Sequence, residues 1–113
     1  MGEWVHIAGL LANGWEDLAF APFHPGVDIF SLVEGEPAVA LLRYAPGAGV
    51  PRHRHDGLET ILVLEGVQSD ERGDYPAGSL VLNPEGSAHS VWSEPGCVVL
   101  IQWDRPVVFT DAT

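Results

Sequence analysis

The sequence predicts an all-β protein, a sandwich or barrel built as one domain, and three observations support this. The length of 113 residues allows one hydrophobic core. The 13 glycines and 9 prolines suit a chain of many short strands and turns. Short apolar runs alternate with these turn residues, and no stretch repeats at 3.6 residues for long enough to predict a helix.

The regular part of the chain begins at Val27, after Pro22, Pro25 and Gly26 interrupt the segment before it. From there each apolar run ends at a turn that contains glycine or proline, and Glu65-Gly66 predicts a turn of this kind. The predicted strands are 27–33, 38–44, 59–64, 67–70, 74–75, 79–83, 88–93 and 97–104.

Several predicted strands are apolar on both faces, for example 61–64 and 98–101. A sheet with one face in water should alternate apolar and polar residues, so the outer face of this sheet must be covered. Residues 1–25 are expected to form an N-terminal extension, with strands at 2–7 and 15–20 that pack on the barrel or on a partner, and residues 26–113 the main domain. Either this extension or a second subunit could supply the cover, and we predict a homodimer.

The charge balance limits the function classes. The chain has 16 acidic residues against 5 arginines, no lysine, and a net charge of −11. Without lysine there is neither a Schiff-base mechanism nor a lysine phosphate clamp. The negative charge repels nucleic acid and anionic membranes, so neither is expected as a partner.

The remaining composition predicts a cytoplasmic protein. No segment approaches the ~20 apolar residues of a membrane span, and Glu3 stands where a signal peptide needs basic residues. Cys97 is the only cysteine and lies in an apolar run, which excludes a disulfide framework and predicts a buried thiol. His6 and His24 are expected to be surface or packing residues, and the four tryptophans core or interface aromatics.

Three histidines and one glutamate are candidates for a metal site. In His53-Arg54-His55, side chains two apart on a strand point to one face, so both imidazoles can converge. Glu59 opens the next strand after a turn at Asp56-Gly57, and His89 begins another strand after a separate turn. Three imidazoles and one carboxylate suit iron, manganese, nickel, copper or zinc and leave coordination positions open.

Glycines and prolines around these residues complete two motifs. The first segment reads G-x5-H-x-H-x3-E-x6-G from Gly47 to Gly66, and the second reads G-x5-P-x-G-x2-H from Gly78 to His89. The pair resembles the two motifs of the cupin superfamily, and the first matches at every position. The second motif ends in Asn in that superfamily, where this chain has Ser93. Because that Asn is not a ligand, the difference concerns the pocket and not the metal site.

Residues from about 25 to 100, including Leu41 to Ala48, Asp74 to Gly78 and Pro84 to His89, look like the cupin domain of ChrR-type anti-sigma factors. The resemblance implies a small β-barrel jelly roll (a double-stranded β-helix) with one divalent metal ion in its mouth: Fe, Zn, Mn or Ni. It places His53, His55, Glu59 and His89 on the ligand positions. Many relatives carry a second Glu where this chain has Thr60, which is expected to face away from the site.

The same subfamily includes dioxygenases that cleave acetylacetone and dihydroxyacetophenone. The first functional hypothesis is therefore an iron(II)-dependent dioxygenase-like enzyme acting on a small diketone or hydroxyketone, with Glu59 required for catalysis. The alternative is a ChrR-like module that senses a metal or small ligand without turnover. The first 25 residues contain no cysteine, which argues against the zinc-binding domain with which ChrR-type proteins capture a sigma factor. A structural cupin with an idle metal is a third reading.

Overall fold

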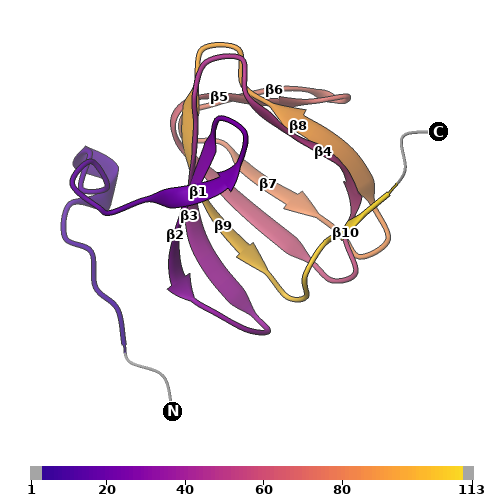
Figure 1. The fold of residues 1–113 in the computed structure, drawn as a ribbon, viewed down its shortest axis with the longest axis horizontal. Coiled ribbons are helices and arrows are strands. Elements are labelled where there is room, and N and C mark those ends of the chain that lie inside the picture. The colour runs from indigo at the N-terminus through magenta and orange to yellow at the C-terminus, as the bar shows by residue number, and fades with distance from the viewer. Residues whose placement is uncertain (1–3, 111–113) are drawn as a thin grey trace.

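The computed structural model describes residues 4–110, which form a single ten-stranded sheet in the order β1-β2-β3-β9-β5-β8-β4-β10, with β6 and β7 paired to β5. The sheet curls into a half-barrel (Figure 1), which confirms the all-β prediction. The strands are β1 (Ala21–His24), β2 (Val27–Val33), β3 (Ala38–Tyr44), β4 (Gly49–Arg54), β5 (Glu59–Asp70), β6 (Gly73–Pro76), β7 (Leu80–Asn83), β8 (Ala88–Trp92), β9 (Cys97–Trp103) and β10 (Val108–Phe109).

Strands β2 and β3 begin and end where the sequence predicts, whereas β5 does not. The sequence predicts a turn at Glu65-Gly66, but β5 runs through it as one strand of 12 residues. The register with β9 shifts between Val63 and Glu65, and Gly66 has a φ of 75°. A Cβ on Gly66 would lie 2.0 Å from the Gly96 carbonyl oxygen. The glycine therefore marks a bulge at a close contact between strands and not a turn.

The half-barrel encloses the main core. Its buried members alternate along the strands, with Leu42, Ile61, Val63, Val99 and Ile101 among them. Cys97 is buried in the same cluster, as the sequence predicts, and burial raises the pKa of its thiol to about 11. The thiol is therefore protonated at neutral pH and has little nucleophilic character.

Residues 7–20 of the predicted extension cover the outer face of the sheet without forming strands, whereas residues 21–24 form β1 at its edge. Residues 15–18 form turns and a bend, residues 19 and 20 are irregular, and the only helical piece among the described residues is the 3-10 helix η1 (Leu10–Ala12). The prediction of a strand at 15–20 is therefore wrong; of the strand predicted at 2–7, residues 2 and 3 lie outside the described residues and 4–7 are not in a strand.

Trp15 is what fixes this segment in place. Its side chain is only 7% exposed and forms a second cluster with Leu41 and Val98, which lie on the outer face of the sheet. Apolar side chains of the segment and of the sheet pack around this cluster: Ile7, Leu10, Leu18, Phe20, Phe30, Leu32, Leu64 and Leu100. A segment without regular strands, anchored by Trp15, thus supplies cover that the sequence assigns to N-terminal strands or to a second subunit.

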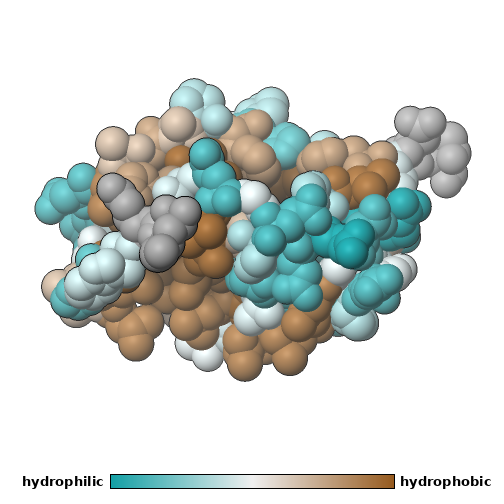
Figure 2. Space-filling model, turned by 90° about the horizontal axis from the view of Figure 1, so that it is seen from below, coloured by the Kyte–Doolittle hydropathy of each residue, from teal (hydrophilic) through white to brown (hydrophobic). Residues whose placement is uncertain are grey.

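Part of the surface remains apolar. Figure 2 shows a broad hydrophobic area beside a hydrophilic one on the face seen from below. Leu80 and Leu82 of β7 are 63% and 55% exposed, and Phe109 of β10 is 47% exposed. Within residues 4–110 there is no helix long and apolar enough to cross a membrane.

Candidate metal centre

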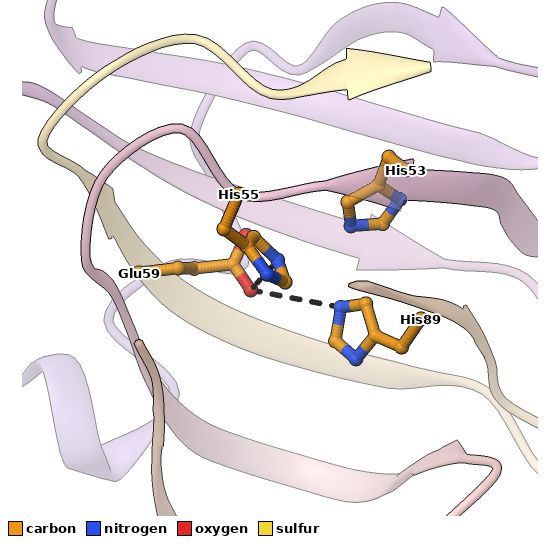
Figure 3. Close-up of side chains that lie close together, drawn as sticks. All are labelled: His53, His55, Glu59 and His89. Carbon is orange, nitrogen blue, oxygen red and sulfur yellow. Dashed lines mark ion pairs between the residues drawn. The ribbon is translucent and has the colours of Figure 1, made fainter. Parts of the chain in front are cut away.

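Strand pairing brings the four predicted site residues together. His53 of β4 lies directly opposite His89 of β8 in the antiparallel ladder. Glu59 is the first residue of β5, and His55 follows the end of β4. All four side chains are buried, and one potential ligand atom from each lies within 4.8 Å of the others. Figure 3 shows the side chains converging from these separate elements on one point.

Each imidazole is oriented by a hydrogen bond at Nδ1. His53 Nδ1 lies 2.8 Å from the Pro51 carbonyl oxygen, His55 Nδ1 lies 3.1 Å from that of Ser87, and His89 Nδ1 lies 3.0 Å from Asp70 Oδ2. Carbonyl and carboxylate oxygens only accept hydrogen bonds, so Nδ1 must donate in all three rings. A neutral imidazole then carries its lone pair on Nε2, the atom free to bind a metal ion.

Two of the three Nε2 atoms have no hydrogen-bond partner that would use their lone pairs. Those of His55 and His89 are buried without one among the described residues, although they lie 3.0 and 3.8 Å from Glu59 Oε1. Lone pairs that face a carboxylate oxygen in a buried site repel it unless a cation lies between them. The cluster therefore fits a metal ion, and His53, His55, Glu59 and His89 could bind one.

The protonation states also suit a cation. Burial, assisted by the nearby His89 and His55, lowers the pKa of His53, which keeps this ring neutral. Burial alone would raise the pKa of Glu59, but a positive charge beside it, which protonated His55 and His89 or a bound ion supplies, and a hydrogen bond from Asn83 outweigh this and lower the pKa. At neutral pH the cluster therefore offers an ionised carboxylate and a neutral imidazole.

Two further hydrogen bonds hold the carboxylate of Glu59. Asn83 Nδ2 donates to Oε1 over 2.9 Å, and Trp103 Nε1 donates to Oε2 over 2.8 Å. Trp103 lies opposite Glu59 in the β5–β9 ladder, and Asn83 lies opposite it in the β5–β7 ladder. Both carboxylate oxygens are thus fixed in direction before any ion binds.

A small cavity of about 30 Å³ lies beside three of the four residues, His53, Glu59 and His89. This is room for about two water molecules. Its walls are mostly apolar: Phe23, Leu42, Val50, Ile61, Val91, Ile101, Val107 and Phe109. Tyr44 and Gln68 add a hydroxyl and an amide, joined by a 3.4 Å hydrogen bond. Burial raises the pKa of Tyr44 strongly, so its hydroxyl stays protonated.

The other sequence expectations near the site have mixed outcomes. Thr60 faces away from Glu59, as predicted, because burial alternates along β5. Ser93 is fully buried, and its hydroxyl donates to the Val67 carbonyl, so it ties two strands together. Asp70, Asn83 and the contact of Trp103 with Glu59 were not predicted, because they depend on cross-strand neighbours that no local motif reveals.

Comparison with known proteins gives the same family as the motifs. A model of the ChrR Cupin-like domain matches residues 11–105, so the match begins inside the predicted extension. The anti-sigma-E factor ChrR of Cereibacter sphaeroides is 33% identical over 106 residues, which cover 91% of this chain and 50% of the relative. The chain thus spans about half the length of that curated relative.

Solved structures share the fold. The complex of Rhodobacter sphaeroides SigE with the anti-sigma ChrR matches with a TM-score of 0.72 and 33% identity, over 79% of this chain and 50% of that one. An acetylacetone dioxygenase from Acinetobacter johnsonii matches with a TM-score of 0.81 over 99% of this chain and 80% of that one. Its identity is 16%, so it shows the cupin fold alone. On the family match and the identity to ChrR, this chain belongs to the ChrR Cupin-like domain family.

Proposed function

We propose that this chain is a cupin module that holds one divalent metal ion on His53, His55, Glu59 and His89 and senses a small ligand beside it. The observation that carries the proposal is the set of buried Nε2 lone pairs that face the Glu59 carboxylate without a hydrogen-bond partner. The metal would act as a Lewis acid that binds an oxygen atom of the ligand. Its identity, among Fe, Zn, Mn and Ni, depends on supply as well as on these ligands.

Sensing has more support than turnover. The relative with 33% identity is an anti-sigma factor, whereas the dioxygenase structure is 16% identical. Both oxygens of Glu59 accept hydrogen bonds, which suits a metal ligand better than a group that exchanges protons. Among the described residues that line the cavity there is no serine, cysteine or lysine to act as a nucleophile, and the hydroxyl of Tyr44 stays protonated.

The cavity indicates the class of ligand. A neighbouring surface groove of about 260 Å³ shares Phe23, Trp103, Val107 and Phe109 with the cavity, so the way in is apolar. A small, mainly apolar molecule with one or two oxygen donors suits these walls, with its oxygen atoms in the cavity beside the metal and its apolar part in the groove. Diketones and hydroxyketones belong to this class. A cationic ligand would lose its hydration and gain no ion pair in return, because the metal ion would repel it.

A dioxygenase-like enzyme acting on the same class of carbonyl compound is the second candidate, with Glu59 required for turnover. The apolar cavity favours it, because walls that exclude water protect reactive species. The candidates differ in the fate of the ligand and not in the site that binds it.

The first prediction separates the two candidates. Protein loaded anaerobically with iron(II) is expected to bind pentane-2,4-dione or a related ketone, raise its melting temperature, and leave the compound intact in air. The measurements are thermal unfolding, an oxygen electrode and chromatography of the ketone. The variant His53→Ala/His55→Ala is the control and should show no ketone-dependent shift. Oxygen uptake in step with ketone loss, abolished by Glu59→Ala, would establish the enzyme instead.

The second prediction concerns pH. Metal binding needs neutral imidazoles, and an unperturbed histidine titrates near pH 6.5. Because the pKa of His53 is lowered and a bound ion competes with protons, metal should remain bound at pH 6.5 and be lost as the pH falls further. Equilibrium dialysis across this range measures the occupancy. Full occupancy down to about pH 4 would contradict a site with three histidine ligands.

The partner of the module is proposed to be a protein that responds to the state of the cupin, since ChrR is solved in complex with SigE. The predicted homodimer stays a prediction. The exposed Leu80 and Leu82 of β7 are compatible with a dimer. The cover that Trp15 supplies means that a second subunit is not needed to bury the outer face around Leu41 and Val98.

A further inference from the structure

The turn between β5 and β6 is connected to the candidate ligand His89. Asp70, at the end of β5, accepts a hydrogen bond from His89 Nδ1 over 3.0 Å. Glu71 accepts the backbone N–H of Ser90, next to His89, over 3.0 to 3.1 Å. The turn is therefore attached to β8 at the position of a metal ligand. Burial would raise the pKa of Asp70, but hydrogen bonds from His89, Tyr75 and Arg72 outweigh it and lower the pKa to about 2.

Arg72, the next residue of this turn, connects His89 with Glu59. One nitrogen of its guanidinium, Nη2, donates to Asp70 Oδ2 over 3.0 Å and also to Asn83 Oδ1. Asn83 in turn donates its Nδ2 to Glu59 Oε1 over 2.9 Å. A single arginine thus bridges the residue that orients His89 and the residue that orients Glu59.

The chemistry of the groups permits only one direction for the chain from Arg72 to Glu59. A guanidinium only donates hydrogen bonds, and an ionised carboxylate only accepts them. The amide of Asn83 must therefore turn its oxygen toward Arg72 and its nitrogen toward Glu59. Without the guanidinium, the amide oxygen of the fully buried Asn83 would lose its side-chain hydrogen-bond donor, which favours a displaced amide. Arg72 thus helps to fix the orientation of Asn83, and Asn83 in turn orients the candidate ligand Glu59.

We propose that Arg72 is a positioning residue for the metal centre, which holds His89 through Asp70 and Glu59 through Asn83. The inference rests on the proposed function, because it assumes that these residues bind metal. Arg72 is also where the network meets solvent: its side chain is 53% exposed, whereas that of Asp70 is 1% exposed. A contact at the β5–β6 turn that engages Arg72 would therefore alter the metal centre, and metal binding would stabilise the turn in return.

The sign of the effect separates positioning from simple electrostatics. Arg72 carries a positive charge near the cation site, so its removal should strengthen metal binding if charge alone mattered. A positioning residue has the opposite effect, because loss of an outer hydrogen-bond partner typically weakens metal affinity about 10- to 100-fold. Arg72 acts through a second residue on each side, so we expect the lower end of this range.

The test uses Co²⁺, whose affinity and visible absorption spectrum both report on the ligands. Arg72→Met is expected to raise the Kd for Co²⁺ about 10-fold and to change the spectrum of the bound ion. Arg72→Lys keeps the charge but loses the planar fork, and its Kd should lie between those of Arg72→Met and the wild type. Melting of the metal-free variants shows whether each folds as the wild type does.

Arg54→Gln is the matched control. Arg54 is about as exposed as Arg72 and forms an ion pair with Asp56, 3.1 Å away, but its side chain donates its hydrogen bond to Asp56 and not to the network behind His89 and Glu59. Its loss should leave the Kd unchanged or slightly lower. If Arg72→Met binds Co²⁺ as tightly as the wild type with the same spectrum, the positioning role is wrong while the metal site stands. If the wild type binds no Co²⁺, the metal site itself is wrong and the inference falls with it.

Discussion

Replacing His53 and His55 together with alanine is expected to abolish the stabilisation of the fold by metal. An ion that binds only the folded state adds about 2.7 kcal/mol at a free concentration 100 times its Kd. For a domain of this size the melting temperature of the wild type should rise by about 10 °C. The double variant lacks two of the four convergent ligand atoms and should show no rise. Calorimetry with and without Co²⁺ measures the melting temperatures of the wild type and of the double variant.

His6→Ala is the control for this experiment. His6 is exposed, lies outside both motifs and is not part of the cluster, so its variant should show the full metal-dependent rise. An equal rise in the wild type and the double variant would mean that the ion binds elsewhere, for example among the many surface carboxylates.

Replacing Trp15 with alanine is expected to cost about 3 to 5 kcal/mol of unfolding free energy, the usual range for a buried tryptophan. Trp15 is 7% exposed and joins the N-terminal segment to Leu41 and Val98 on the outer face of the sheet. Its loss would open a cavity there and expose the sheet to water. Urea unfolding gives the free energy, and Trp15→Phe should restore part of it.

Trp4→Ala is the matched control, because Trp4 belongs to the same segment but is 90% exposed. Its replacement should change the stability by no more than about 0.5 kcal/mol. Equal effects of the two substitutions would show that the segment does not cover the sheet in solution. A second copy of the chain would then be the remaining source of the cover.

The strands and the four site residues could be predicted because their signals are local. Turn residues delimit β2 and β3, and the spacing of His53, His55 and Glu59 around one turn places them near one another. The link between this group and His89 came from resemblance to a family. The structure adds its geometric reason, which is the direct pairing of His53 with His89 across β4 and β8.

What could not be predicted depends on contacts between distant residues. Trp103 reaches Glu59 because β9 pairs with β5 in one particular register, which the apolar run 97–101 does not specify. In the sequence, Asp70 and Arg72 belong to an ordinary polar turn. Only the fold shows that Asp70 hydrogen-bonds to His89 and that Arg72 hydrogen-bonds to Asn83. In the N-terminal segment, the residues predicted as a strand at 15–20 form no strand, and Trp15 is the one buried residue among them.

The measurement that tests the central claim most directly is a count of metal ions per chain. Wild-type protein, dialysed against Co²⁺ at neutral pH and freed of loosely bound ion, should retain one equivalent by elemental analysis. The variant His53→Ala/His55→Ala, treated in the same way, should retain none. A full equivalent in the double variant, or none in the wild type, would contradict the assignment of His53, His55, Glu59 and His89 as the metal site.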